Sequence, residues 1–339
     1  MNGKFIAAFL AFASFYTFGL AQGYAGLGVN ADGYSDADPN YIIEFPKDAG
    51  AHKDFRVEWW YLTANLEAED GRKLGIQWTL FRNSVTQEPG DGWQSNQIWM
   101  AHAAVTTKDD HVFAEKFARG GVGQAGVQSD PFSAWIDNWE FRLHDNELRL
   151  NAGAVEFKIE LRLNDQIGPV LQGDNGYSVK SAGGQASHYY SQPYLTANGQ
   201  VELRGERWRV SGTAWLDREW SSQPLSSDQS GWDWVGLSFA DGRRLMAARV
   251  RGENDFRFGN LKEADGTVLK LDNSEIRFTP LENTTPPTRW ALSVGELDLE
   301  IDALNNDAWT GNAFQYWEGP VDVTGDQEGV GYLEMTGYR

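Results

Sequence analysis

The amino-acid sequence predicts an all-β protein made of two tandem antiparallel β-barrel or sandwich domains. Three observations predict this fold: a surplus of aromatic residues, short apolar runs separated by turn dipeptides, and a faint internal repeat. The 339 residues are too many for one small barrel and suit two domains of ordinary size. We expect the domains at 41–190 and 191–339, because Gly, Ser, Tyr and Asn are frequent between 183 and 199.

The composition and the turn signals both favour strands. The chain contains 15 Trp, 12 Tyr and 18 Phe, and such large rings are enriched in strands, in barrel interiors and in ligand sites. No long amphipathic helix stands out between the short apolar runs. Asp-Gly and Asn-Gly dipeptides, which adopt the tight turns of β-hairpins, separate these runs. The dipeptides are Asp70-Gly71, Asp91-Gly92, Asn198-Gly199, Asp241-Gly242 and Asp265-Gly266.

The internal repeat has two copies of one pattern, an aromatic run followed by an Asp-Gly-Arg turn and a run that carries arginine. The first copy spans 58–82 and the second spans 232–249. Two copies of one module predict two domains of the same kind. Because the spacings inside the two copies differ, chance similarity is the alternative.

The N-terminus has the pattern of an export signal. A short basic start, Met1 to Lys4, precedes the apolar run Phe5 to Leu20, and small residues follow at the position of a cleavage site. We therefore expect a signal peptide at 1–21, a linker or loosely docked arm at 22–40, and a periplasmic or secreted mature protein. The run is short for a membrane span, so we expect no transmembrane segment in the mature chain; an uncleaved anchor is the alternative.

Charge and missing motifs exclude several classes of function. The net charge is −19 with a pI near 4.6, which disfavours binding to nucleic acids and to anionic lipids. The chain has no cysteine, so disulfides and thiolate metal sites are excluded, and no histidine pair has metal-ligand spacing. No G-x-S-x-G elbow, P-loop or dinucleotide fingerprint occurs. We expect no metal and no cofactor.

The densest candidate site is the run Gly-Thr-Ala-Trp-Leu-Asp-Arg-Glu-Trp at 212–220. As a strand it places Trp215, Asp217 and Glu219 on one face. A carboxyl group beside an indole is partly desolvated, and a second carboxyl group nearby repels its charge; both effects raise the pKa toward that of a general acid. The alternative is structural pairing of these carboxylates with Arg218 or Arg249.

Two further segments carry candidate residues. A buried Glu58 needs a cationic partner such as Arg56 or Arg82, and we favour a structural ion pair there. His102 lies in an apolar strand, where a histidine held by a carbonyl or a carboxylate is the alternative to a catalytic one. His188 stands in a run rich in tyrosine, in which hydroxyl groups can bond a ligand oxygen or relay a proton; a packed connection between domains is equally consistent with that run.

These residues resemble the AttH-like / carotenoid 1,2-hydratase (CrtC) family, whose members are often labelled secreted hydrolases. The resemblance runs from 41 to 339 and ends in the C-terminal run Gly-Tyr-Leu-Glu-Met-Thr-Gly-Tyr. It is carried by Phe55-Arg56-Val57-Glu58-Trp59-Trp60-Tyr61, Ala101-His102-Ala103, Tyr189-Tyr190-Ser191-Gln192-Pro193 and Trp215-Leu216-Asp217-Arg218-Glu219-Trp220. The resemblance implies tandem lipocalin-like domains. Because the family includes hydratases, pericyclase-like proteins and exported proteins of unknown activity, it does not fix the function.

The resemblance implies a site that binds an apolar molecule and hydrates a C=C bond by acid catalysis. Asp217 is then the acid, with Glu219 and His102 as further catalytic candidates. We predict six ligand-binding residues: Trp215, Trp220, Tyr190 and His188, which the resemblance implies, together with Trp60 and Trp234. If the protein is an enzyme, we expect a hydratase (hydro-lyase) that acts on an isoprenoid- or acyl-like molecule, with Asp217 or Glu219 facing a closed apolar cavity. The alternative is a non-catalytic carrier of a lipophilic ligand, or an accessory protein of an ABC-type exporter, with an open pocket and carboxylates paired to arginines.

Overall fold

The structure, a computed structural model, describes residues 24–29 and 31–339. The predicted signal peptide, 1–21, lies outside the described residues, as does the start of the predicted arm. The described chain is all-β, with two nearly closed antiparallel sheets, which confirms the prediction of two tandem lipocalin-like β-domains. Its helices are short 3₁₀ segments, none of them long and apolar enough to cross a membrane. They are η1 (Tyr24–Gly26), η2 (Lys47–Ala49) and η3 (Gly92–Gln94).

The first sheet, called sheet A, has the strand order β4-β3-β2-β1-β13-β12-β9-β8-β7-β6-β5, with β10 and β11 paired to β12. Its strands are β1 (Val57–Ala68), β2 (Lys73–Ser84), β3 (Gln97–Thr106), β4 (His111–Arg119), β5 (Ala125–Ser129), β6 (Phe132–Ile136), β7 (Trp139–His144), β8 (Glu147–Gly153), β9 (Phe157–Asp165), β10 (Val170–Leu171), β11 (Tyr177–Val179), β12 (Ala186–Leu203) and β13 (Glu206–Ser221). Because β1 pairs with β13, the first and the last strands of the sheet are neighbours.

The second sheet, called sheet B, has the order β17-β16-β15-β14-β23-β22-β20-β19-β18, with β21 paired to β22. Its strands are β14 (Gly231–Phe239), β15 (Arg244–Arg251), β16 (Phe256–Lys262), β17 (Val268–Leu271), β18 (Ile276–Pro280), β19 (Arg289–Val294), β20 (Leu297–Ala303), β21 (Trp309–Thr310), β22 (Tyr316–Gly325) and β23 (Gly329–Thr336). Again the first strand, β14, pairs with the last, β23.

The internal repeat corresponds to the hairpin that begins each sheet. The first copy forms β1 and β2, and the second forms β14 and β15. In both hairpins an acidic residue of the first strand lies directly opposite an arginine of the second, Glu58 opposite Arg82 and Asp233 opposite Arg249. Both pairs are ion pairs. The repeat is therefore structural and includes a buried cross-strand charge pair.

The break between the sheets lies later in the chain than the sequence suggested. The expected boundary at 190/191 falls inside β12, which pairs with β13 along most of its length. Sheet A ends with β13, and the connection to sheet B is residues 222–230. The small residues that suggested a linker serve strand packing, since a Cβ atom at Gly199 would collide with the backbone carbonyl of Glu160 on β9.

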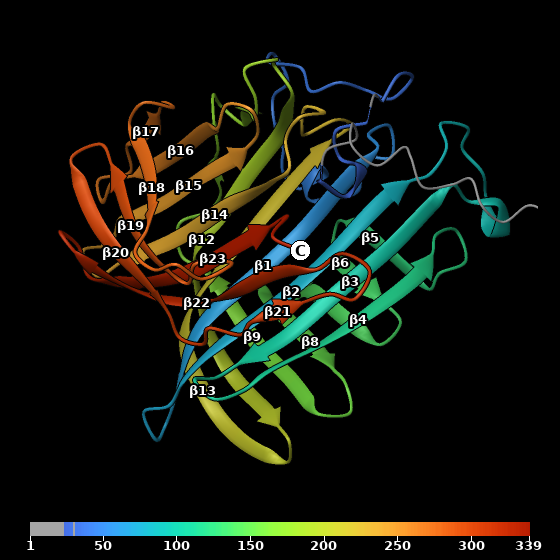
Figure 1. Cartoon of the computed structure of the whole chain (residues 1–339). Helices are drawn as coiled ribbons and strands as arrows, with labels where there is room; N and C mark the ends of the chain where they lie inside the picture. The colour runs from blue at the N-terminus through green and yellow to red at the C-terminus, as the bar shows by residue number, and fades with distance from the viewer. Residues whose placement is uncertain (1–23, 30) are drawn as a thin grey trace, which may run out of the picture.

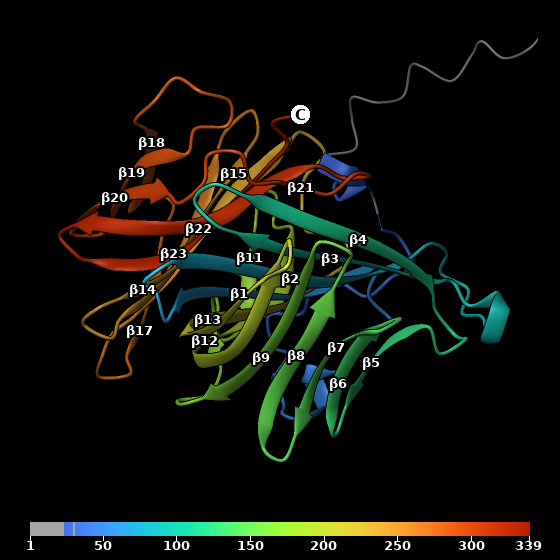
Figure 2. The same ribbon diagram turned by 90° about the horizontal axis from the view of Figure 1, so that it is seen from below.

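The two sheets contact each other through their outer faces. Figures 1 and 2 show β22 and β23 lying against β1 and β2. The approach is close at Gly75, where any side chain would collide with Pro320 and Tyr332. The interior of each barrel holds its own apolar core, represented by Leu62 in sheet A and by Leu237 in sheet B. A separate cluster, mostly aromatic, lies between the sheets.

The described part of the predicted arm is bonded to the body of the protein. The Tyr34 hydroxyl donates to the Ser84 carbonyl over 3.1 Å, and the Ser222 hydroxyl donates to the carbonyl of Ser35 over 2.6 Å. The Arg56 guanidinium donates to the carbonyl of Gly26 over 3.3 Å. These bonds hold the arm across one end of the space between the sheets.

Candidate functional site

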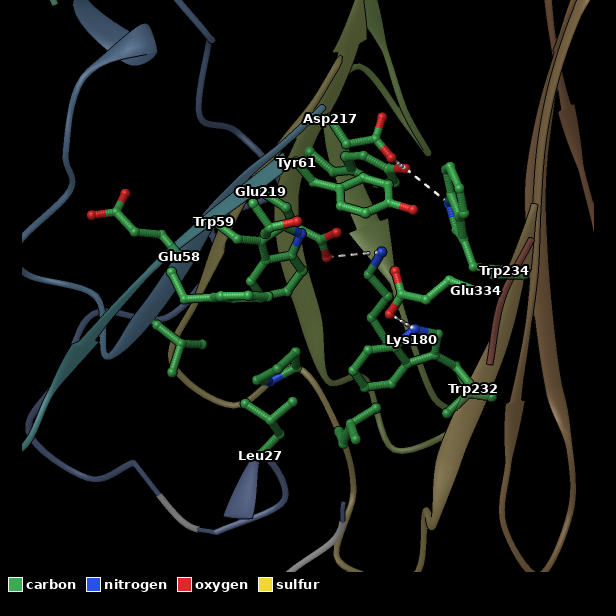
Figure 3. A pocket seen from close by; sticks show the side chains of 18 of the residues that line it. Leu27, Glu58, Trp59, Tyr61, Lys180, Asp217, Glu219, Trp232, Trp234 and Glu334 are labelled. Atoms are coloured by element: carbon green, nitrogen blue, oxygen red, sulfur yellow. Dashed lines mark hydrogen bonds and ion pairs between the residues drawn. The ribbon is translucent and has the colours of Figure 1, made fainter. Parts of the chain in front are cut away.

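A cavity of about 150 Å³ lies between the two sheets. Its walls come from β1, β2, β12 and β13 on one side and from β14, β15, β16, β22 and β23 on the other, and Leu27 of the arm closes part of it (Figure 3). The aromatic residues in the walls are Trp59, Tyr61, Phe81, Tyr189, Trp232, Trp234, Phe258 and Tyr316. The cavity is thus an aromatic chamber outside both barrel interiors.

Strand register decides which side chains of sheet A face the cavity. Asp217 lies directly opposite Tyr61 on β1 and Ser191 on β12, and Glu219 lies opposite Trp59 and Tyr189. Directly opposite residues of neighbouring strands point to the same face. The alternation of β13 therefore brings Asp217 and Glu219 together on the cavity side, as the sequence predicted.

Asp217 is buried in the cavity wall and forms no ion pair with any residue that the structure describes. Its carboxyl group accepts hydrogen bonds from the Tyr189 hydroxyl at 2.6 Å, the Ser191 hydroxyl at 2.5 Å and the Trp215 indole at 2.6 Å. Burial raises the pKa of Asp217 to about 7; these three bonds oppose the rise, and the charge of Glu219 adds to it. The predicted direction of the shift is confirmed.

Glu219 has a cationic partner of its own. Its carboxylate lies 3.0 Å from the ammonium group of Lys180 and accepts a hydrogen bond from the Ser187 hydroxyl. Lys180 also lies over the ring of Tyr189 at 4.6 Å and over that of Phe258 at 4.2 Å. Burial lowers the pKa of Lys180, and the charge of Glu219 opposes this.

The arginine partners that the sequence offered as alternatives are engaged elsewhere. Arg218 pairs with Glu58, and Arg249 pairs with Asp233. Neither arginine therefore neutralises Asp217. The partner that Glu219 does have, Lys180, comes from the segment before β12, a contact that strand alternation alone did not suggest.

Two carboxyl groups of sheet B, Glu334 in the cavity wall and Glu318 beside it, were not among the predicted site residues. Glu334 on β23 lines the cavity and accepts a 3.0 Å hydrogen bond from the Trp232 indole. Burial raises the pKa of Glu334 to about 8; the Trp232 bond opposes this shift, and the charges of Asp217 and Glu219 reinforce it. Tyr316 and Glu318 are two residues apart on β22, and Tyr332 and Glu334 are two residues apart on β23. This tyrosine–glutamate spacing is the sequence signal that could have found the two acids.

The second of these, Glu318 on β22, lies directly opposite Glu334. It is 1% exposed, and the hydroxyls of Tyr61 and Tyr316 are the groups that interact favourably with its carboxylate. Burial raises the pKa of Glu318 well above its usual range, and the charge of Glu334 adds to the rise. Among the described residues, no group of three or more His, Cys, Asp or Glu side chains is arranged to hold a metal ion.

His102 reaches the cavity only through another residue. Its ring is fully buried, with Nδ1 2.7 Å from the hydroxyl oxygen of Tyr316 and Nε2 2.8 Å from a carboxylate oxygen of Glu115. Tyr316 lines the cavity. Burial lowers the pKa of His102, and the bond to Glu115 opposes this. The three side chains form a hydrogen-bonded row from sheet A into the cavity wall of sheet B.

The predicted ligand-binding residues divide between the two faces of the sheet. Trp234 lines the cavity, and Trp215 lies behind Asp217 in the aromatic cluster between the sheets. The remaining four do not line the cavity, because they alternate with the cavity-facing positions along β1, β12 and β13. These four are Trp60, Trp220, Tyr190 and His188. These four residues belong to the same sequence motifs as Asp217 or to neighbouring ones. Their side chains nevertheless point to the opposite face of the sheet, because side chains alternate along a strand.

The opposite face of β13 carries a buried ion-pair cluster instead. The carboxylate of Glu58 accepts hydrogen bonds from the guanidinium groups of Arg82 and Arg218, so the predicted Arg82 pair is confirmed. Arg218 also lies over the ring of Trp60, 3.9 Å from its centroid. Burial favours a higher pKa for Glu58, but the charges of Arg218 and Arg82 outweigh it and hold the pKa well below its usual range. In Figure 3 the Glu58 carboxylate points away from the cavity.

The profile of the AttH-like family matches residues 36–338. The chain belongs to the AttH-like family. This AttH-like protein shares 33% sequence identity with a Nitrosomonas europaea protein of known structure that is provisionally named AttH; the match covers 90% of this chain and 99% of that one, with a TM-score of 0.82. The crystal structure of kievitone hydratase from Nectria haematococca is 14% identical, with 90% and 96% coverage and a TM-score of 0.67, so it shares the fold. No curated protein matches the sequence significantly.

Proposed function

We propose that the cavity binds an apolar, isoprenoid- or acyl-like molecule and that Asp217 hydrates a C=C bond of this molecule by acid catalysis. The observation that carries the proposal is a buried carboxyl group in an aromatic cavity, with a pKa of about 7 and no ion-pair partner among the described residues. A general acid works best when its pKa lies near the working pH. Asp217 meets this condition, whereas Glu58 does not.

The proposed reaction uses the cavity in two steps. The Asp217 carboxyl group gives its proton to one alkene carbon, which leaves a carbocation on the other carbon and a carboxylate on Asp217. The faces of Trp and Tyr rings stabilise a cation in a desolvated site. Water then adds to the carbocation, and its extra proton returns to Asp217. The sum is an alkene plus water giving an alcohol, with the acid regenerated.

The alternative is a carrier of a lipophilic ligand or an accessory protein of an ABC-type exporter. That hypothesis predicted cavity carboxylates paired to arginines. Within the described chain, Asp217 and Glu334 form no ion pair, and Glu219 pairs with a lysine. The unpaired acids favour catalysis, and the shared fold of a protein named kievitone hydratase is consistent with it. A periplasmic or secreted location is part of the proposal and depends on the N-terminal sequence pattern.

The first experiment is native mass spectrometry with lipid extraction on the exported protein and on Asp217→Asn, followed by incubation of the extracted ligand in ¹⁸O-labelled water. The matched control is Asp298→Asn, the same chemical change at an exposed position of β20. We expect wild type and the control to form an ¹⁸O-labelled alcohol. We expect Asp217→Asn to retain the ligand without hydrating it.

The outcomes separate the two functions. Hydration by Asp217→Asn at the wild-type rate would exclude Asp217 as the acid. A ligand that both proteins hold equally and leave unchanged would replace the hydratase proposal with a carrier.

A further inference from the structure

We infer that the same cavity binds lipophilic organic cations, an ammonium group on an apolar body, in preference to neutral molecules of the same shape. The inference is about binding and does not depend on the hydration chemistry. It goes beyond the apolar ligand proposed above because it assigns a charge to a second class of ligand. Three features of the cavity carry it: the balance of charge, the aromatic rings and a buried neighbouring acid without a cation.

The balance of charge in the cavity is acidic. Asp217 and Glu219 face it from sheet A, and Glu334 faces it from sheet B. Lys180 lines the cavity too, but its charge is matched by Glu219 at 3.0 Å. Arg82 also lies in the wall, yet its guanidinium is bonded to Glu58 on the other face. Once Asp217 and Glu334 ionise, two negative charges remain without a cation.

The aromatic rings enclose this charge from both sheets. Trp59 and Tyr61 come from β1, and Trp232 and Trp234 come from β14 (Figure 3). The face of an aromatic ring attracts an ammonium group, and this attraction is strongest where water is excluded. A neutral hydrocarbon gains from the same rings only by burial. The rings and carboxylates together therefore favour a cationic ligand over an uncharged one.

A buried acid without a cation, Glu318, lies beside the same wall, directly opposite Glu334. Glu318 is 1% exposed and forms no ion pair with a residue that the structure describes, and the polar groups that interact with it are the uncharged hydroxyls of Tyr61 and Tyr316. A buried carboxyl group without a compensating charge is costly. A cation bound between the sheets would lower this cost, because it stabilises the ionised form of every nearby acid.

This arrangement makes cation binding depend on pH. The titratable groups around the cavity are Asp217 and Glu219 on β13, Glu318 and Tyr316 on β22, Glu334 and Tyr332 on β23, Tyr61 on β1, Tyr189 on β12, and Lys180 before β12. The pKa of Asp217 is about 7 and that of Glu334 is about 8. A cation must displace the protons of these acids at lower pH, so its affinity should rise by up to about tenfold per pH unit for each proton released.

The test compares phenyltrimethylammonium with its neutral isostere tert-butylbenzene. The quaternary nitrogen has a fixed charge, so only the protein titrates. The protein is titrated into each compound in a calorimeter at pH 6 and pH 8. We expect wild type to prefer the cation at least tenfold at pH 8, and this preference to fall at least tenfold at pH 6.

Variants assign the preference to the cavity rather than to the acidic surface. Glu334→Gln should lower the preference for the cation about tenfold at pH 8 and change the affinity for tert-butylbenzene less than twofold. The matched control is Glu300→Gln, the same change at an exposed position of β20, which should alter neither affinity.

Equal affinities for the two compounds in wild type at pH 8 would overturn the inference, and so would a preference that Glu334→Gln and Glu300→Gln reduce alike. The wild-type comparison across pH keeps the inference testable if Glu334→Gln fails to fold. Hydration is measured separately with ¹⁸O, so cation binding and catalysis can fail independently.

Discussion

Glu58 and Asp217 are buried carboxyl groups on neighbouring strands, and their pKa values move in opposite directions. Glu58 lies between the guanidinium groups of Arg82 and Arg218, which hold its pKa well below its usual range. Asp217 accepts three hydrogen bonds from neutral donors, and burial raises its pKa to about 7. Burial is complete at both sites, so the partners decide the outcome.

The difference shows how one strand serves two purposes. Arg218 stands between Asp217 and Glu219 in the sequence, yet its side chain points into the ion-pair cluster on the opposite face. Guanidinium groups ionise a carboxyl group and use it to hold strands together. Hydroxyl and indole donors orient a carboxyl group and leave it able to carry a proton. The cluster on one face therefore holds its carboxylate ionised, and the face toward the cavity raises the pKa of its acids Asp217 and Glu334.

The largest expected effect comes from breaking the ion-pair cluster. Glu58→Gln leaves two buried guanidinium groups without their counter-charge and should lower the free energy of unfolding by about 3–5 kcal/mol at pH 7. Because the folded pKa of Glu58 is depressed, its contribution is present above the unfolded pKa and is lost as the pH falls through the folded pKa. Urea denaturation measures the loss. Glu67→Gln, an exposed position on the same strand, should cost less than about 0.5 kcal/mol; a similar small cost for Glu58→Gln would contradict the comparison.

Replacing Asp217, whose pKa is raised, should increase the free energy of unfolding rather than lower it. The folded pKa of Asp217, about 7, lies above its ordinary value of 3.8, so wild type loses stability as the pH rises from about 4 to about 7. Asp217→Asn has no such loss and should become more stable than wild type across this range, by up to about 4 kcal/mol at pH 8. Urea denaturation at pH 4 and pH 8 measures the gain, with Asp298→Asn as the control. If the difference in free energy of unfolding between Asp217→Asn and Asp298→Asn does not grow with pH, the pKa of Asp217 is not raised.

Tryptophan substitutions on the two faces sharpen the comparison for ligand binding. Trp234→Leu removes part of the cavity wall and should weaken binding of farnesol, a representative isoprenoid, by about tenfold. Trp220→Leu alters the opposite face and should change this affinity less than twofold, although it should lower the stability. Fluorescence titration of the folded variants measures both. Equal weakening would show that the ligand also contacts the face that carries the ion-pair cluster.

The smallest effect is expected at the row of Glu115, His102 and Tyr316. Tyr316→Phe removes the hydroxyl group that bonds His102 across the two sheets and should lower the free energy of unfolding by about 1 kcal/mol. Nuclear magnetic resonance of the His102 ring should show a changed signal for Nδ1, since that nitrogen loses its partner. An unchanged His102 signal would mean that the row does not connect His102 to the cavity.

Local patterns in the sequence predicted much of the fold. Asp-Gly turns at Asp70-Gly71 and Asp241-Gly242 identified the hairpins that begin the two sheets. Strand alternation correctly placed Asp217 and Glu219 on one face and Arg218 on the other. The boundary between the sheets was harder to predict, because Gly199 has the composition of a linker but lies in a close strand pair.

The sequence by itself determined the all-β class, the repeated hairpin and the two faces of β13, because each depends on residues close together in the chain. Only the tertiary structure decided which partners those faces meet. Glu58 lies beside Arg218 because the first strand of sheet A, β1, pairs with its last strand, β13. Asp217 and Glu334 line the same cavity because the outer faces of the two sheets pack together. Such contacts join residues more than a hundred positions apart. Those distant partners decide whether the pKa of a buried carboxyl group falls, as at Glu58, or rises, as at Asp217.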